Sequence, residues 1–200
     1  LITLHLGNGA SACAIKSGKS IDTSMGMTPL EGLMMGTRCG DIDPAIIPFL
    51  SHNHEMDINA IDTMLNKESG LKGICGTNDM REVVKQTEEG DTLSSLALEM
   101  YSYRIKKYIG AYSAILGRVD AIIFTGGIGE HAEKVREMVC EELNESIGLK
   151  IDLFKNRESF KRKREIHDKK SRIQILVIPT NEELEIALQT EKIIKSILLV

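Results

Sequence analysis

The sequence lacks the basic excess and the long apolar runs that mark two common classes of protein. Its 25 lysines and arginines are outnumbered by 29 aspartates and glutamates, which gives a net charge of −4. This balance argues against a nucleic-acid-binding surface, which is normally strongly basic. No run approaches the roughly 20 apolar residues that cross a bilayer, and no basic leader segment is present. We therefore expect partners that are neither nucleic acid nor membrane.

The chain also lacks paired cysteines and an initial methionine. Its four cysteines are scattered and form no C-x-x-C pair, and no histidines lie near them at metal-binding spacing. We expect reduced, mostly buried thiols and a cytoplasmic location. Because the chain begins with Leu1, we also expect it to be a fragment or a processed chain.

The first part of the chain is typical of an antiparallel meander followed by a long loop. The segment LITLHL (1–6) is apolar and partly β-branched, and SACAIKSGKSID (11–22) alternates around a central turn. Glycine and proline interrupt residues 27–44, and a loop of this length in a compact domain is usually functional. A helix should follow, with Asp43 as its N-cap and Pro44 as its first residue.

The remainder is expected to contain helices and two further buried strands. The strand VDAIIFTGG (119–127) should precede one helix over 130–146, and RIQILVIPT (172–180) should precede a terminal helix. The charged run over 156–171 predicts a solvated linker or an exposed hairpin. A meander followed by strand–helix units predicts a one-domain mixed-sheet α/β fold. Further helices are predicted over 57–70, 77–90 and 91–117.

Polar and glycine residues follow three of the apolar strands, in HLGNGAS, FTGGIGEH and IPTNEE. Because ligands gather at the carboxyl ends of strands in α/β sheets, we expect these segments to share one cleft. Gly7 and Gly9 allow backbone amides to approach an anion, although this segment taken alone favours an ordinary hairpin turn. The strand–glycine–helix order of FTGGIGEH favours an anion more strongly, since helix N-termini attract anions. It lacks the P-loop sequence, and a structural turn remains an alternative.

Two charged residues stand out as candidates for chemistry. Arg38 lies in the glycine-flanked segment GTRCG, from which it could neutralise a phosphoryl group. The alternative is a surface ion pair with Asp41 or Asp43. Glu182 follows a buried strand and could be a Mg²⁺ ligand. The alternative is a helix N-terminal carboxylate beside an Asn181 N-cap.

Together these segments resemble the acetokinase family. The resemblance rests on HLGNGAS, DTSMGMTPLEGLMMGTRCGDIDPAI, GTNDMRE, FTGGIGEH and IPTNEELEIA, in this order. It implies an α/β fold, a ribonuclease-H-like mixed sheet with flanking helices of the acetate and sugar kinase/Hsp70/actin superfamily. It also implies two such domains with the nucleotide between them. Residues 1–200 then correspond to the C-terminal nucleotide-binding domain, with the N-terminal domain absent from this chain.

The resemblance also implies roles for individual residues. Arg38 is expected to stabilise the transferring phosphoryl group, and Glu182 is expected to associate with Mg²⁺ or Mn²⁺. Asparagine is commoner in the family where this chain has His131, which puts that one contact in doubt. His5 fits either a phosphate donor or a strut beneath the turn. The nucleotide-binding residues implied are His5, Leu6, Gly7, Asn8, Gly9, Asp79, Met80, Arg81, Gly127, Ile128, Gly129, Glu130 and His131.

The implied reaction is reversible transfer of the ATP γ-phosphate to acetate, giving acetyl phosphate and ADP, on the route to acetyl-CoA. Propionate kinase is the nearest alternative. The resemblance implies a homodimer, for which the tyrosines of the 91–117 helix offer a surface, although they suit a core equally. The family's other half supplies an asparagine, an arginine, an aspartate and a histidine of the active site. We therefore expect this chain alone to bind nucleotide weakly without turnover.

Two other classes share some of these features. A non-catalytic Hsp70/actin-like nucleotide-binding module would have the glycine turns, but it gives no reason for Arg38 in its glycine-flanked loop. An NAD-binding oxidoreductase is disfavoured because GGIGEH lacks a clean G-x-G-x-x-G and because no acidic strand-end residue follows at the usual spacing.

Overall fold

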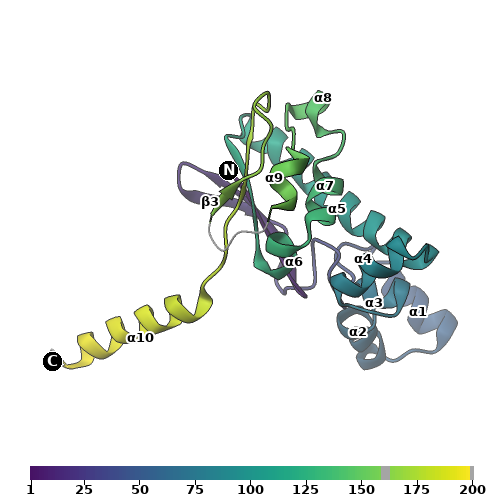
Figure 1. Cartoon of the computed structure of the whole chain (residues 1–200). Coiled ribbons are helices and arrows are strands. Elements are labelled where there is room, and N and C mark those ends of the chain that lie inside the picture. The colour runs from purple at the N-terminus through teal and green to yellow at the C-terminus, as the bar shows by residue number, and fades with distance from the viewer. Residues whose placement is uncertain (159–162, 199–200) are drawn as a thin grey trace.

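The computed structural model describes residues 1–158 and 163–198, and it is built around one mixed sheet (Figure 1). The sheet has six strands in the order β3-β2-β1-β4-β6-β5. The predicted meander and the two later strands are therefore confirmed. The strands are β1 (Ile2–Leu6), β2 (Ala10–Lys16), β3 (Lys19–Thr23), β4 (Ala121–Thr125), β5 (Arg164–Glu165) and β6 (Gln174–Val177).

The pairing of the strands brings the three predicted site segments to one edge of the sheet. Strand β1 runs antiparallel to β2 but parallel to β4, and β4 runs parallel to β6. His5 pairs with Thr125 across β1 and β4, so the segments after these strands emerge side by side. HLGNGAS, FTGGIGEH and IPTNEE therefore lie at one edge of the sheet, and the expectation that they share one cleft stays a prediction.

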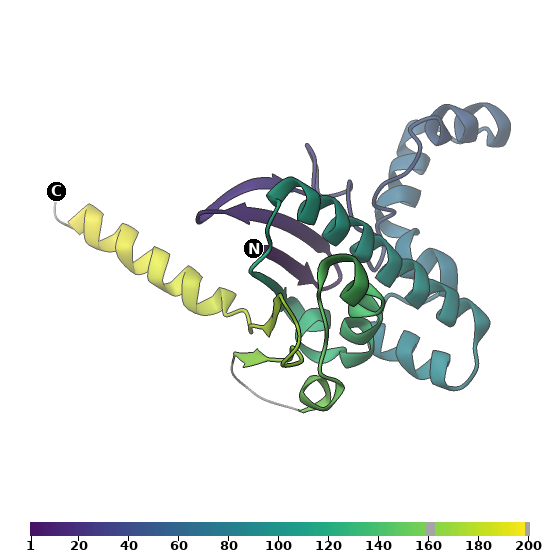
Figure 2. The same ribbon diagram turned by 90° about the horizontal axis from the view of Figure 1, so that it is seen from above.

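Helices cover one face of this sheet (Figure 2). Alternate residues of β1 (Ile2, Leu4 and Leu6) are fully buried, whereas His5 lies on the other face and is only partly buried. The buried face packs in one core with α5 and α7. The helices are α1 (Ile46–His54), α2 (Ile58–Lys67), α3 (Gly70–Cys75), α4 (Met80–Glu88), α5 (Thr92–Leu116), α6 (Gly126–His131), α7 (Glu133–Cys140), α8 (Leu143–Ile147), α9 (Leu153–Arg157) and α10 (Glu182–Leu198).

Two helix predictions are wrong in their boundaries. Helix α1 begins at Ile46, not Pro44, because the Asp43 carboxylate accepts from the Ala45 amide and forms a separate turn before the helix. The single helix expected over 130–146 is broken into α6, α7 and α8. The second break occurs at Glu142, whose φ of 65° is left-handed and cannot continue a helix.

Other predictions need correction in the charged run and at the cysteines. Part of 156–171 forms β5 and pairs with β6, while residues 159–162 lie outside the described residues. All four cysteines are free, as expected, but only Cys140 is buried and the other three are partly exposed. Burial raises the pKa of the Cys140 thiol to about 12. The expectation of mostly buried thiols is therefore wrong.

The last helix, α10, projects away from the rest of the molecule (Figures 1 and 2). Its described side chains are exposed, including large apolar ones such as Ile186 and Ile193. In the described part of the chain, no helix has both the length and the apolar character needed to cross a bilayer.

Candidate functional site

The first glycine turn joins β1 to β2 and leaves two backbone amides free. Gly7 N donates to Gly9 O at 2.9 Å, so the Gly7 amide is used within the turn and cannot hold a phosphate as expected. Within residues 1–158 and 163–198, the amides of Asn8 and Gly9 have no hydrogen-bond acceptor. The backbone amides available to an anion at this turn are therefore those of Asn8 and Gly9 rather than that of Gly7.

Arg38 lies against this turn. A Cβ atom added at Gly9 would lie 3.3 Å from Arg38 Nη1, so a side chain there would crowd the guanidinium. Arg38 Nη1 donates to the Pro29 carbonyl at 3.2 Å. The ion pair with Asp41 or Asp43, which was the alternative role, is not among the ion pairs of the described residues. The guanidinium thus remains beside the free amides.

A second residue, which sequence reasoning missed, fastens the turn to neighbouring segments. Asn78 Nδ2 donates to Asn8 Oδ1 at 2.9 Å, and Gly36 N donates to the Asn8 carbonyl at 3.0 Å. A Cβ atom at Gly36 would lie 2.3 Å from Asn8 Oδ1, so a side chain there would displace the Asn8 amide from this position. The only signal in the sequence was the position of Asn78 beside the candidate Asp79.

The segment Asp79–Arg81 forms the start of α4. Asp79 is the N-cap of α4 and accepts from the Arg81 amide, and the Arg81 guanidinium also pairs with the Asp79 carboxylate at 2.6 Å. These bonds to Arg81 lower the pKa of Asp79 to about 2. The Met80 side chain is buried in the core, so only its backbone is available to a ligand. Asn78 connects this segment to the first turn.

The second glycine turn is the first part of α6. Gly126 has a φ of 77°, and a Cβ atom there would lie 2.8 Å from the Leu6 carbonyl, so β1 and α6 approach closely only because this residue is glycine. Gly127 is exposed and has open space around its Cα. The first amides of a helix have no partner within it, so Gly127 and Ile128 present donors at the sheet edge.

A buried arginine supports the second turn from behind. Arg136 of α7 is only 1% exposed and donates to the Gly129 carbonyl at 2.9 Å. Its other nitrogens donate to the side chain and backbone of Asn156 in α9. Burial lowers the Arg136 pKa to about 10, and the nearby Arg164 adds to this shift. Arg164, from the charged run, donates to the Glu130 carbonyl at 2.9 Å.

The third strand end is joined to the second turn through Glu130. Thr180 N donates to Glu130 Oε1 at 3.0 Å. Asn181 Oδ1 accepts from the Leu184 amide, so its predicted role as an N-cap is confirmed. The side chain of Glu182 lies outside the described residues, so its role as a metal ligand stays a prediction. Among the described residues, no three His, Cys, Asp or Glu side chains form a group that could hold a metal.

The predicted site residues thus fall into three groups, at the first turn, at the start of α4 and at the second turn. Asn8, Gly9 and Arg38 meet at the first turn, and the 127–131 segment lies next to it along the edge. The side chain of Leu6 belongs to the core, and that of His131 is exposed. His5 is partly buried, and both of its expected roles, as a phosphate donor or as a strut beneath the turn, stay predictions.

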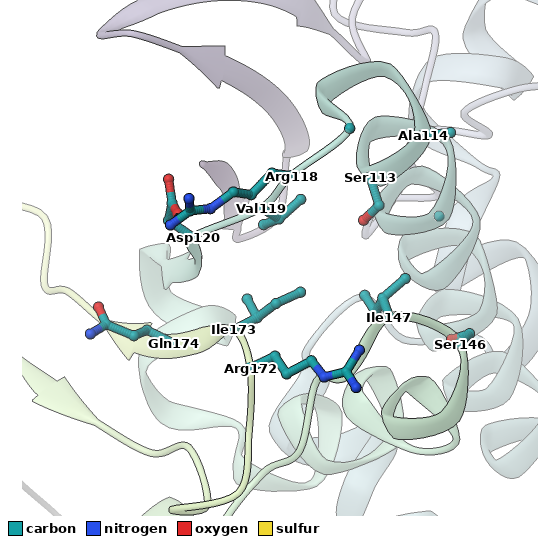
Figure 3. Close-up of a pocket in the computed structure, with 12 residues that line it drawn as sticks. Ser113, Ala114, Arg118, Val119, Asp120, Ser146, Ile147, Arg172, Ile173 and Gln174 are labelled. Carbon is teal, nitrogen blue, oxygen red and sulfur yellow. The ribbon is translucent and has the colours of Figure 1, made fainter.

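A large cavity lies elsewhere, at the opposite ends of β4 and β6 (Figure 3). Its volume is about 880 Å³, and its walls include Ser113, Arg118, Ile147 and Arg172. Arg118 pairs with Asp120 at 2.8 Å beside it. Because Asp120 precedes β4 whereas the glycine turn follows it, this cavity is separate from the candidate site.

Comparisons with known proteins identify relatives of this chain. A family model described as the Acetokinase family matches residues 1–188. The acetate kinase of a Sulfurovum species is 66% identical over 194 residues, a match that covers 97% of this chain and 49% of that protein. The chain therefore spans about half the length of the curated relatives it matches.

Two solved structures are similar in fold. The acetate kinase of Porphyromonas gingivalis has a TM-score of 0.90 and 44% identity, covering 96% of this chain and 48% of that one. A propionate kinase from Francisella tularensis has a TM-score of 0.86 and 49% identity, covering 92% of this chain and 46% of that one. These matches confirm the predicted fold class, with its ribonuclease-H-like mixed sheet and flanking helices.

Proposed function

The chain belongs to the acetokinase family, as its motifs predicted, and from that premise we propose that it is the nucleotide-binding half of an acetate kinase. In this proposal residues 1–200 are the C-terminal domain, and the acetate-binding groups lie in the other half. The whole protein transfers the γ-phosphate of ATP to acetate, giving acetyl phosphate and ADP. The observation that carries the proposal is the meeting of Arg38 with the free amides of Asn8 and Gly9 at the sheet edge.

The proposed mechanism depends on alignment and charge neutralisation. Phosphoryl transfer needs little covalent help, so an enzyme accelerates it by holding the reactants in line and stabilising the charge on the moving group. The amides of Asn8 and Gly9 on one side, and of Gly127 and Ile128 on the other, bind phosphate oxygens. The Arg38 guanidinium contacts the transferring phosphoryl group and can bind two of its oxygens at once.

The proposed reaction also requires a divalent cation, Mg²⁺ or Mn²⁺. Mg²⁺ is usually held by one or two carboxylates together with substrate phosphates, rather than by a full set of protein ligands. Glu182, in the first turn of α10 directly after the third strand end, is the residue that would hold the ion. When bound, the ion supplies positive charge to the phosphate oxygens.

Two acyl substrates are candidates, acetate and, second, propionate. The chain is 49% identical to a propionate kinase and 44% identical to an acetate kinase of known structure. The 66% identity to a curated acetate kinase favours acetate. The ratio of kcat/KM for acetate to that for propionate decides between them.

We further propose that the protein is a cytoplasmic homodimer. Its free thiols favour a reducing compartment. A row of exposed apolar side chains on α5 offers a dimer surface, and Tyr103 belongs to it, whereas Tyr101 and Tyr112 are buried in the core. Light scattering on the purified protein measures the assembly. The row consists of Leu93, Leu96, Met100 and Tyr103.

The proposal is tested on the encoded protein with both halves present. Acetate, ATP and Mg²⁺ should give acetyl phosphate, trapped as the hydroxamate, and omission of acetate is the control. ATP should raise the Tm of the protein and NAD should not, because the site is built for a triphosphate. The 200-residue chain alone should form no acetyl phosphate. Stabilisation by NAD rather than ATP, or no product from the encoded protein, would contradict the proposed function.

A further inference from the structure

A group of side chains on α5 fastens the loop that carries the candidate catalytic arginine. Tyr108 Oη donates to Asp41 Oδ2 at 2.8 Å, and Arg104 Nη2 donates to the Asp41 carbonyl at 2.7 Å. The other carboxylate oxygen of Asp41 accepts from Gly32 N at 2.8 Å, and Asp41 N donates back to Gly32 O at 2.9 Å. Asp41 therefore closes the loop 32–41 on itself and ties it to the helix.

The helix end of this connection is rigid, and the loop end is tightly folded. Ile105 and Ile109, on the turns of α5 that carry the two donors, are 0% exposed. Gly40 has a φ of 69°, and a Cβ atom there would lie 2.5 Å from the Gly32 carbonyl. Burial moves the pKa of the Tyr108 hydroxyl further above neutral, so the hydroxyl keeps the proton that it donates to Asp41. These hydrogen bonds therefore hold the loop 32–41 in a fixed position relative to the core-packed helix α5.

We propose that Tyr108, acting through Asp41, is a positioning residue for Arg38. This inference rests on the proposed function and assigns a part of the site that the family motifs do not. Arg38 lies three residues before Asp41, between the closed base of the loop and the first glycine turn. A guanidinium that stabilises developing charge must be held in place beforehand. Loosening its loop therefore lowers the rate of transfer more than it weakens substrate binding.

The first test is Tyr108→Phe in the encoded protein, which removes one hydroxyl and keeps the ring. We expect kcat to fall about fivefold, as for the loss of one hydrogen bond, with KM for ATP and acetate nearly unchanged. Tyr101→Phe is the matched control, since Tyr101 lies on the same helix and its buried hydroxyl has no hydrogen-bond partner among the described residues. It should leave kcat unchanged. An unaltered kcat in Tyr108→Phe contradicts the inference.

A double-mutant cycle separates positioning from a general structural role. If Tyr108 acts through Arg38, then Tyr108→Phe should cost little further activity in an Arg38→Ala protein. An equal loss in both backgrounds would overturn the inference.

A chemical readout does not depend on turnover. The rate at which phenylglyoxal modifies Arg38, followed by peptide mass spectrometry, should rise in Tyr108→Phe and not in Tyr101→Phe. If the encoded protein makes no acetyl phosphate, the proposed function fails, but this rate still tests the connection. A rate equal to that of the wild type refutes the positioning role.

Discussion

The two glycine turns at the sheet edge are supported in different ways. The first turn joins two antiparallel strands and contacts the loop that carries Arg38, which is partly exposed. The second turn begins a helix and rests on Arg136, which is 1% exposed and bonded to Gly129. The first turn therefore lies beside the proposed catalytic arginine, and the second turn is attached to the core. We expect changes near the first turn to alter turnover, and changes behind the second to alter stability and nucleotide binding.

The largest expected effect comes from Arg38→Ala at the first turn. Removing the guanidinium should lower kcat by about a thousandfold, as for other arginines that neutralise a transferring phosphoryl group. KM for ATP should change little, because the amides of Asn8 and Gly9 remain. Steady-state kinetics on the encoded protein measures both constants. Equal losses in kcat and in ATP affinity would mean that Arg38 only anchors the substrate.

Arg136→Met should act on stability instead. The change leaves the carbonyl of Gly129 and the polar groups of Asn156 without their donors inside the core. We expect the free energy of unfolding to fall by about 3 kcal/mol and ATP to bind more weakly, since the second turn loses its support. Denaturant unfolding and calorimetric titration check the two effects. Arg118→Met, at an exposed arginine of the other edge, is the control. If Arg136→Met is as stable as the wild type and binds ATP normally, then Arg136 does not support the second turn and the proposed difference between the two turns is wrong.

The smallest expected effect is the pH-dependent contribution of Asp79. Its hydrogen bonds to Arg81 lower its pKa from 3.8 to about 2. A carboxyl whose pKa is lowered on folding stabilises the fold above its unfolded pKa, and this contribution is lost as the pH falls. Asp79→Asn should therefore lower the Tm slightly near neutral pH, and the difference from the wild type should shrink between pH 3.8 and about 2. A difference that is constant with pH would mean that the ion pair is not responsible. Glu89→Gln, at the other end of the helix, controls for surface charge.

The sequence predicted the elements whose signals are local. An apolar, β-branched run identified β1 and alternation identified β2, and the helix predicted over 91–117 ends at the residues that the structure has as N-cap and C-cap of α5. The start of α1 and the break at Glu142 depend on backbone turns that the apolar pattern does not encode. Strand β5 has only two residues, too few for a pattern.

The site was predictable where residues adjoin in sequence, and less so where distant segments meet. The glycine turns and Arg38 were identified from strand ends and loop composition. Asn78 was missed because its partner, Asn8, lies 70 residues away. Arg136 was missed because it lies in a charged helical segment, and its burial results from contacts with α9. The Gly7 amide was misassigned because its bond to Gly9 depends on the shape of the turn.

The most direct test is a structure of the encoded protein with Mg²⁺ and a non-hydrolysable ATP analogue. We predict that the β- and γ-phosphates lie within hydrogen-bond distance of the Asn8, Gly9 and Gly127 amides, with the Arg38 guanidinium on the γ-phosphate. Phosphates bound away from both turns, for example in the cavity beside Arg172, would contradict the assignment of this sheet edge.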